Sequence, residues 1–189
     1  MKYVQKIVGE SVYLSPVHTD DAETYIRWLN DFRVTDGLGQ STTTLSLREE
    51  HEWLERAQSS NGNHDFAIVR LSDDKLLGNG SLFNLRAPSM HAETGLFIGE
   101  AENRGKGYGT QALRLLVSYG FFYLNLHNIM LKVFSFNEAA IGMYQKIGFR
   151  EIGRRRQSYF LNGKRYDDVM MDILREEFPV NYIKNAQER

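Results

Sequence analysis

The stretch HAETGLFIGEAENRGKGYGTQALRLLVSYGFFYL, residues 91–124, organises the rest of the chain. Its first part, from His91 to Ile98, has the apolar content of a strand. A short charged loop follows, and a long apolar helix begins directly after closely spaced glycines. A strand, a glycine loop and an apolar helix in this order predict a place where the backbone can hold a ligand.

The loop RGKGYGT, residues 104–110, is suited to an anion. It contains three glycines, Gly105, Gly107 and Gly109. Glycines leave backbone N–H groups uncovered, and the start of the next helix adds unpaired N–H groups at the positive end of its dipole. The side chains of Arg104 and Lys106 add full positive charges. We therefore expect the loop to bind a pyrophosphate group.

The composition limits the classes of function. A chain of 189 residues with 42% hydrophobic and 25% charged residues is typical of one globular domain, expected here over residues 1–189. The net charge of −1 supplies no electrostatic reason to bind nucleic acid or an acidic membrane. The absence of cysteine excludes disulfides, thiolate-zinc sites and a cysteine nucleophile.

Two further patterns concern location and metals. No stretch reaches the ~20 apolar residues of a membrane span, and the start MKYVQKIVGESVYL lacks the apolar core of a signal peptide. The five histidines are not paired at metal-ligand spacing. The sequence therefore predicts a cytoplasmic protein without a metal site.

Residues before the glycine loop predict two helices separated by a polar segment. The first helix should end at about Asn30. Residues 31–45 are polar and contain two glycines, so we expect a loop there. Ser46 and Glu49 form a capping box, whose helix should end near Asn61–Gly62.

Alternation of apolar and polar residues predicts strands on both sides of the loop. They lie at residues 11–14, 66–69, 76–85, 91–98, 129–134, 149–153 and 166–174. The strands before the loop should form an antiparallel meander, with Gly78 and Gly80 as candidates for a bulge. A last helix should begin at Asn137 and end at Gly148, and Asn162–Gly163 should turn the final hairpin.

Three simpler interpretations of the loop compete. A P-loop needs Ser or Thr after Gly-Lys, whereas Gly107 follows Lys106. A dinucleotide loop needs G-x-G-x-x-G and an acidic residue after the next strand, whereas this chain has G-x-G-x-G and Ser135-Phe136-Asn137. A glycine turn before a buried helix, with no ligand, is the third interpretation.

The order Arg104-x-x-Gly107-x-Gly109 between a strand and a helix resembles the acyl-CoA pyrophosphate loop of the GCN5-related N-acetyltransferase (GNAT) family. The stretch NEAAIGMYQKIGF, residues 137–149, is similar to the family's pattern of Asn, Ala and Tyr closed by Gly-Phe. The resemblance covers about residues 10–175.

Shorter segments point to branches of that family. WLND at 28–31 resembles the ribosomal-protein N-acetyltransferases. LNLH at 124–127, FLNG at 160–163 and YDDV at 166–169 resemble the polyamine N-acetyltransferases.

The resemblance implies an α+β fold. Its sheet would be mixed, mostly antiparallel and seven-stranded, flanked by helices and splayed into a V-shaped cleft. It also implies an N-acetyltransferase that moves an acetyl group from acetyl-CoA directly to a primary amine in a ternary complex. The cofactor-binding residues implied are Leu96, Phe97, Ile98, Arg104, Gly105, Lys106, Gly107, Tyr108, Gly109, Thr110, Asn137 and Tyr144.

The resemblance also implies roles for individual side chains. Tyr144 stands where family members place a tyrosine near the sulfur of acetyl-CoA, as the general acid. Packing in an apolar stripe is the alternative for Tyr144. Asn137 would hold the pantetheine chain or cap its own helix. The backbone of Leu96, Phe97 and Ile98 would supply donors to the pantetheine arm and the developing oxyanion.

Glu93 is the candidate general base, because some family members carry an acidic residue there. A base is needed since an alkyl ammonium has a pKa of about 10.4. An exposed carboxylate without a role is the equal alternative for Glu93. Alanine N-acetyltransferases often carry Glu where this chain has Lys132, which weakens an assignment to N-terminal peptide acetylation. A base acting through water stays open.

The acceptor is open between small amines, such as polyamines or aminosugars, and the N-terminus or a lysine of a protein. A polycation would need carboxylates, and candidates in and after the early polar segment are Asp31, Asp36, Glu49, Glu50 and Glu52. A non-catalytic acyl-CoA-binding or interaction module with the same fold is the alternative to an enzyme. We expect no nucleic acid or membrane partner, and a homodimer is compatible with the family.

Overall fold

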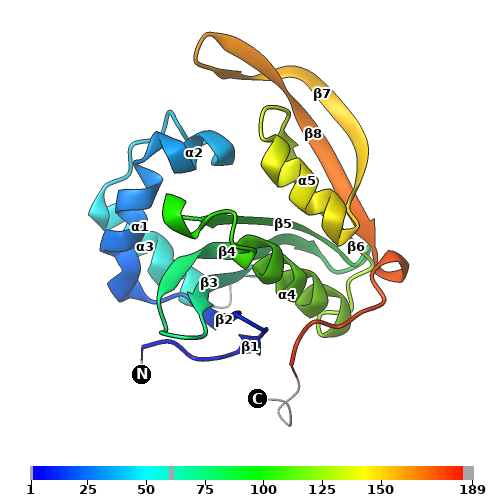
Figure 1. Ribbon diagram of the computed structural model, residues 1–189, viewed down its shortest axis with the longest axis horizontal. Coiled ribbons are helices and arrows are strands. Elements are labelled where there is room, and N and C mark those ends of the chain that lie inside the picture. Colours follow the sequence, from blue (N-terminus) through cyan, green and yellow to red (C-terminus); the bar gives the residue numbers. More distant parts are fainter. Residues whose placement is uncertain (1, 60–61, 185–189) are drawn as a thin grey trace.

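The computed structural model describes residues 2–59 and 62–184, which form one twisted sheet covered by helices (Figure 1). The strands are β1 (Ile7–Val8), β2 (Val12–Pro16), β3 (His64–Arg70), β4 (Leu76–Arg86), β5 (His91–Ile98), β6 (Asn128–Phe134), β7 (Arg150–Leu161) and β8 (Lys164–Leu174). The α-helices are α1 (Ala22–Leu29), α2 (Phe32–Leu38), α3 (Leu47–Gln58), α4 (Tyr108–Phe122) and α5 (Glu138–Ile147). Single 3-10 turns lie at Thr19–Asp21, Ala101–Asn103 and Arg175–Glu177.

The sheet has eight strands in the order β1-β2-β3-β4-β5-β6-β8-β7. All neighbours are antiparallel except β5 and β6. The predicted α+β class and the mixed, mostly antiparallel sheet are confirmed. The eighth strand is β1, whose two residues are too few to show a period in the sequence. The register shift between β3 and β4 skips Leu77, next to Gly78, so one of the two proposed bulge positions is right.

The strand alternation divides the core between two helical layers. On one face, Val12, Leu14 and Ile68 pack with residues of α4. On the other face, Tyr13 and Val69 pack with residues of α1 and α3. A third cluster joins α4 and α5 to β6 and β8. The sheet is therefore covered by α1–α3 on one side and by α4 and α5 on the other.

The segment 31–45 contains a helix, so the predicted loop there is wrong in its first half. The side chain of Asp31 accepts a hydrogen bond from the backbone N of Arg33 and caps α2. Gly39, with φ of +72°, ends it in the left-handed conformation. Two turns with few apolar residues show no clear helical period. The cap residues at both ends were the local signals that could have indicated this helix.

The capping box of Ser46 and Glu49 at the start of α3 is confirmed. That helix ends at Gln58, and Asn61, near which its end was expected, lies outside the described residues. The helix from Asn137 to Gly148 and the last hairpin are also confirmed. Together these elements place α2 and α5 on opposite sides of the end of β5 (Figure 1).

Helix α1 approaches the backbone closely at Gly99, directly after β5. An ideal Cβ on Gly99 would lie 2.1 Å from Cδ2 of Trp28 in α1. The Trp28 ring is 3% exposed and packs edge-on against Phe97 at a centroid distance of 6.1 Å. Only glycine lets this indole lie flat against the backbone.

We expect Gly99→Ala to lower the free energy of unfolding by about 1–3 kcal/mol, because the ring must move from its packed position. Urea denaturation would measure the change. Gly142→Ala is the matched control: an added Cβ at this position in α5 meets no atom within 4 Å, and alanine favours a helix. Equal stability of the two variants would contradict the packing role of Gly99.

Candidate active site

The site begins where β5 and β6 separate. Their parallel pairing extends only from His91 to Glu93 on β5. From Thr94 to Ile98, β5 pairs with β4 alone among the described strands. The hydrogen bond from Gly99 N to Leu77 O, at 2.9 Å, fixes which groups of β5 face β4. By the antiparallel alternation, the N–H of Phe97 points to β4, and the N–H groups of Leu96 and Ile98 point into the gap.

A cleft of about 750 Å³ lies between this part of the sheet and the helices α1–α3. Side chains of β4, β5 and β6 line it from the sheet, and residues of α1, α2, α3 and the α2–α3 connection line the opposite wall. Tyr144 also lines it, although α5 packs on the far face of the sheet. The cleft therefore reaches through the gap between β5 and β6.

Tyr144 is held at this gap by a helix with well-defined ends. The side chain of Asn137 accepts a hydrogen bond from Ala140 N at 3.2 Å, and Gly148, with φ of +117°, ends α5. The Tyr144 ring is 8% exposed and packs edge-on against Phe149. Burial raises the pKa of the Tyr144 phenol to about 12. The phenol is therefore protonated at neutral pH.

Glu93 lies on the same cleft, at the last residue where β5 still pairs with β6. It is half-buried, and Asn84 Nδ2 donates a hydrogen bond to its Oε1 at 3.0 Å. Lys132 lines the cleft from β6 and pairs with Asp168 at 3.7 Å. The structure thus brings Glu93 and Tyr144 to one cavity, as their assignment to one reaction requires.

The glycine loop forms the start of α4. Gly105 and Gly107 have φ of +72° and +85°, and an added Cβ on either would meet no atom within 4 Å. Gly107 is the N-cap of α4, and no side chain caps this end among the described residues. The first N–H groups of α4 therefore remain available to a ligand. An added Cβ on Gly109 would be in ordinary contact with Leu96 and Ile98, so the loop adjoins the open edge of β5.

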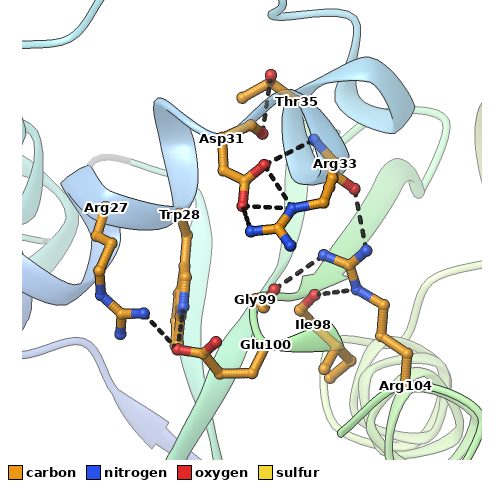
Figure 2. Close-up of polar contacts among 9 residues, drawn as sticks. All are labelled: Arg27, Trp28, Asp31, Arg33, Thr35, Ile98, Gly99, Glu100 and Arg104. Carbon is orange, nitrogen blue, oxygen red and sulfur yellow. Dashed lines mark hydrogen bonds and ion pairs between the residues drawn. The ribbon is translucent and has the colours of Figure 1, made fainter. Parts of the chain in front are cut away.

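Arg104 has a structural role that the sequence does not reveal (Figure 2). Its Nε donates to Ile98 O at 3.0 Å and its Nη2 donates to Gly99 O at 2.8 Å. Its Nη1 donates to Arg33 O in α2 at 3.0 Å. The guanidinium thus ties the end of β5 to α2, which carries part of the cleft wall. Backbone carbonyls from a distant helix have no sequence signature, so only the fold could identify these partners.

A second link lies beside the first (Figure 2). Arg27 Nη1 and Trp28 Nε1 in α1 both donate to Glu100 Oε1, at 2.6 Å and 3.0 Å. These hydrogen bonds lower the pKa of the Glu100 carboxyl, Trp28 contributing most. The segment between β5 and the glycine loop is therefore fastened to both α1 and α2.

Of the five carboxylates proposed for the acceptor, the structure brings two to the cleft, Glu49 and Glu50. Asp31 pairs with Arg33, Asp36 accepts a hydrogen bond from Ser41, and Glu52 pairs with Arg48. Those three do not line the cleft.

Glu50 is the unusual member of this group. Its side chain is 3% exposed, and its Oε1 has no hydrogen-bond partner in the described part of the chain. Burial raises the pKa of Glu50 to about 7. Carboxyls of this kind occur mostly at functional sites, because an unpaired buried charge costs stability.

Residues 2–59 and 62–184 contain no cluster of three or more His, Asp or Glu that could hold a metal ion. None of their helices is long and apolar enough to cross a membrane.

The chain is similar to known proteins in both sequence and fold. The family described as Acetyltransferase (GNAT) domain matches residues 11–150. A protein of Bacillus subtilis (strain 168) named "Probable N-acetyltransferase YjcK" is 31% identical over 174 residues, which cover 88% of this chain and 95% of the relative. The solved spermidine N-acetyltransferase of Vibrio cholerae, in complex with CoA and spermine, has a TM-score of 0.81 at 24% identity, covering 88% of this chain and 97% of that one.

Two relatives match over shorter segments. YdaF of the same Bacillus strain, named for ribosomal N-acetylation, is 35% identical over 108 residues, 57% of this chain and 58% of the relative. The spermidine N(1)-acetyltransferase of Escherichia coli (strain K12) is 38% identical over 77 residues, 41% of each chain. Both branches that the sequence motifs suggested are therefore represented.

The buried Glu50 predicts how stability depends on pH. The pKa of Glu50 in the folded protein is about 7, above the ordinary 4.5, because burial disfavours its charged form. The contribution of Glu50 to the free energy of unfolding is therefore fully present below pH 4.5 and is lost as the pH rises through 7. Glu50→Gln cannot ionise. We expect the free energy of unfolding of this variant, relative to that of the wild type, to increase by on the order of 2 kcal/mol between pH 5 and pH 8.

Urea denaturation at a series of pH values would measure this difference. Glu49→Gln is the control with the opposite sign, since hydrogen bonds from Ser46 lower the pKa of Glu49. That variant should lose stability relative to the wild type as the pH rises up to about 4.5, and the two should run parallel above it. Parallel curves for Glu50→Gln and the wild type would show that Glu50 is solvated in the folded protein.

Proposed function

This chain belongs to the acetyltransferase (GNAT) family and is an acetyl-CoA-dependent N-acetyltransferase, and we propose that it transfers the acetyl group directly to a small primary amine. One observation carries the proposal. Tyr144 on α5 and Glu93 on β5, from opposite sides of the gap between β5 and β6, line the same cleft. An acid and a base that share a cavity with an open strand edge fit acetyl transfer from a thioester to an amine.

We propose that acetyl-CoA is held by backbone groups more than by side chains. The N–H groups of Leu96 and Ile98 face the gap and would bind the pantetheine arm and the thioester carbonyl. Gly105 to Thr110, with Lys106, would bind the pyrophosphate at the start of α4. The contacts of Arg104 support a role in holding this loop in place. Its positive charge would also attract the pyrophosphate.

Phe97 and Asn137, two of the residues predicted to bind the cofactor, make other contacts in the structure. The N–H of Phe97 faces β4, and its ring packs with Tyr25 and Trp28 on the acceptor side. Asn137 caps α5, as its ordinary use predicts. Its Nδ2 lies close to Gly37 of α2. We keep a contact between Asn137 and the pantetheine arm of the coenzyme as part of the proposal.

In the proposed reaction, Glu93 takes the proton from the ammonium group, directly or through water. The free amine attacks the thioester carbonyl carbon, and the N–H groups of Leu96 and Ile98 stabilise the oxyanion. The carbon–sulfur bond then breaks. Tyr144 donates its hydrogen bond to the leaving sulfur, and the proton lost by nitrogen balances the proton gained by the thiolate.

The raised pKa of Tyr144 refines its role. A phenol of pKa about 12 gives up a proton less readily than a thiol of pKa about 8.5. Its contribution is therefore a hydrogen bond that strengthens as negative charge grows on sulfur, followed by proton transfer from the substrate nitrogen.

A small amine is favoured over a protein N-terminus by the shape and charge of the cleft. Helices α1–α3 cover its outer wall, and Glu49, Glu50 and Glu93 line it. Lys132, where alanine N-acetyltransferases carry Glu, pairs with Asp168 instead of facing an amine as a base. The relative named for spermidine supports the same acceptor class, whereas the relative named for ribosomal acetylation supports a protein amine.

Release of free thiol from acetyl-CoA across a panel of monoamines, polyamines, aminosugars and peptides tests the acceptor. Turnover with small amines supports the proposal. Turnover with peptides alone would assign a protein acceptor, and tight coenzyme A binding without any turnover would indicate a non-catalytic module.

A cytoplasmic location and a homodimer complete the proposal, and cell fractionation and light scattering test them.

We expect Tyr144→Phe to lower kcat by about 10²-fold, in the range seen when a hydrogen bond to a charge developing in the transition state is removed. Affinity for coenzyme A should change little, because the ring and its packing on Phe149 are kept. Steady-state kinetics and calorimetric titration of coenzyme A would separate the two effects. Unchanged kcat would leave Tyr144 as a packing residue only.

We expect Gly107→Glu to abolish acetyl-CoA binding, because a negative side chain would stand at the anion site. Gly107→Asn is the matched control, since asparagine tolerates a positive φ and carries no charge. Calorimetry with coenzyme A, with circular dichroism to verify folding, should show binding for the Asn variant only. Equal affinity of the Glu variant and the wild type would refute the loop assignment.

A further inference from the structure

We propose that Glu50 binds a second positive charge on the acceptor, so that the enzyme selects diamines and polyamines over monoamines. The inference rests on the proposed function and makes its acceptor class specific. It assigns Glu50 a role in substrate recognition, separate from the base role of Glu93.

The first reason is that Glu50 is buried with one carboxyl oxygen left unsatisfied by the described residues. The residue lines the cleft but is 3% exposed, and Oε1 has no hydrogen-bond partner among the described residues. A buried carboxylate in that state is costly unless another group completes its shell. The terminal torsion of a glutamate is broad, so either carboxyl oxygen can turn toward the cleft.

Two other polar side chains that line the cleft are already engaged. Tyr25 also lines the cleft, and its hydroxyl donates to Gly78 O at 3.5 Å. Asn79 Nδ2 donates to Phe66 O at 3.1 Å. An incoming ammonium group is thus the natural partner for Glu50, since it brings donors and a full positive charge to an unpaired anion.

The second reason is the position of Glu50 relative to the reacting end. Glu50 stands on α3, in the helical wall of the cleft, whereas Glu93 stands on β5, in the wall formed by the sheet.

Glu93 lies at the last residue where β5 pairs with β6, and it accepts a hydrogen bond from Asn84. The two carboxyls therefore line the cleft from opposite walls. An extended acceptor can place one amine beside Glu93 and Tyr144 and direct a second ammonium toward Glu50.

The cleft is also lined by the charged side chains of Glu49 and Arg56 on α3 and of Lys132 on β6. Arg56 is already engaged by another group of the chain. Glu49 accepts hydrogen bonds from Ser46 at the start of α3, so its carboxylate is occupied by the helix cap. Lys132 pairs with Asp168 on the sheet side. Glu50 is thus the carboxylate of α3 that a bound cation would pair with, between apolar walls formed by side chains such as Trp53 and Phe97.

The test compares alkyl monoamines with α,ω-diamines of matched chain length and with spermidine, using wild type and Glu50→Gln. Glu50→Gln keeps the shape of the side chain and removes its charge. We expect kcat/KM for diamines and spermidine to fall roughly 10- to 100-fold, mainly through KM, as for loss of a charged hydrogen bond. Monoamine kcat/KM should stay within about twofold, since no second ammonium is lost.

Glu52→Gln is the matched control on the same helix. Glu52 is exposed, pairs with Arg48 and does not line the cleft, so all acceptors should be unaffected. Equal loss for monoamines and diamines in Glu50→Gln, or a shifted pH profile of kcat for monoamines, would overturn the proposal and indicate a role in catalysis or folding. No change with any amine would overturn it as well.

Calorimetric titration of spermidine into coenzyme-A-saturated protein separates this inference from the proposed function. Weaker binding to Glu50→Gln than to wild type supports the role of Glu50, even if no amine is acetylated. Equal binding to both overturns it, whatever the outcome of the thiol-release panel.

Discussion

The parallel pairing of β5 with β6 ends at Glu93, and the two strands then run apart. A strand edge without a partner must satisfy its N–H and C=O groups in another way. Here the carbonyl of Ile98 is taken by Arg104, and the N–H groups of Leu96 and Ile98 are left facing the gap. The same separation lets Tyr144 reach a cleft on the opposite face of the sheet, where the proposed function has coenzyme and acceptor meet.

The two sides of the site share their supports. Arg104 connects the end of β5 to α2, and Glu100 connects the same segment to α1 through Arg27 and Trp28. Both helices line the acceptor wall, whereas the glycine loop that follows Arg104 is the proposed coenzyme site. The two sides are therefore held in one relative position by charge-assisted hydrogen bonds.

Local signals predicted most of the fold correctly. The Ser46–Glu49 capping box and the left-handed Gly148 act within a few residues, so the sequence displays them directly. The α2 helix was missed because two turns carry too little apolar pattern, and it is held partly by Arg104 from far along the chain. Among the candidate carboxylates, sequence could name Glu50 but not distinguish it from Asp31 or Glu52, since burial arises only when α3 packs on the sheet.

The sequence by itself determined the family, the glycine loop and the order of strands and helices, because turns, caps and periodic patterns are set by neighbouring residues. Only the tertiary structure decided which side chains meet. Glu93 and Tyr144 lie on separate elements and share a cleft because β5 and β6 diverge. Arg104 reaches the carbonyl of Arg33, 71 residues away, and Glu50 is buried with an oxygen that no described residue satisfies, because both environments form only when distant segments pack together.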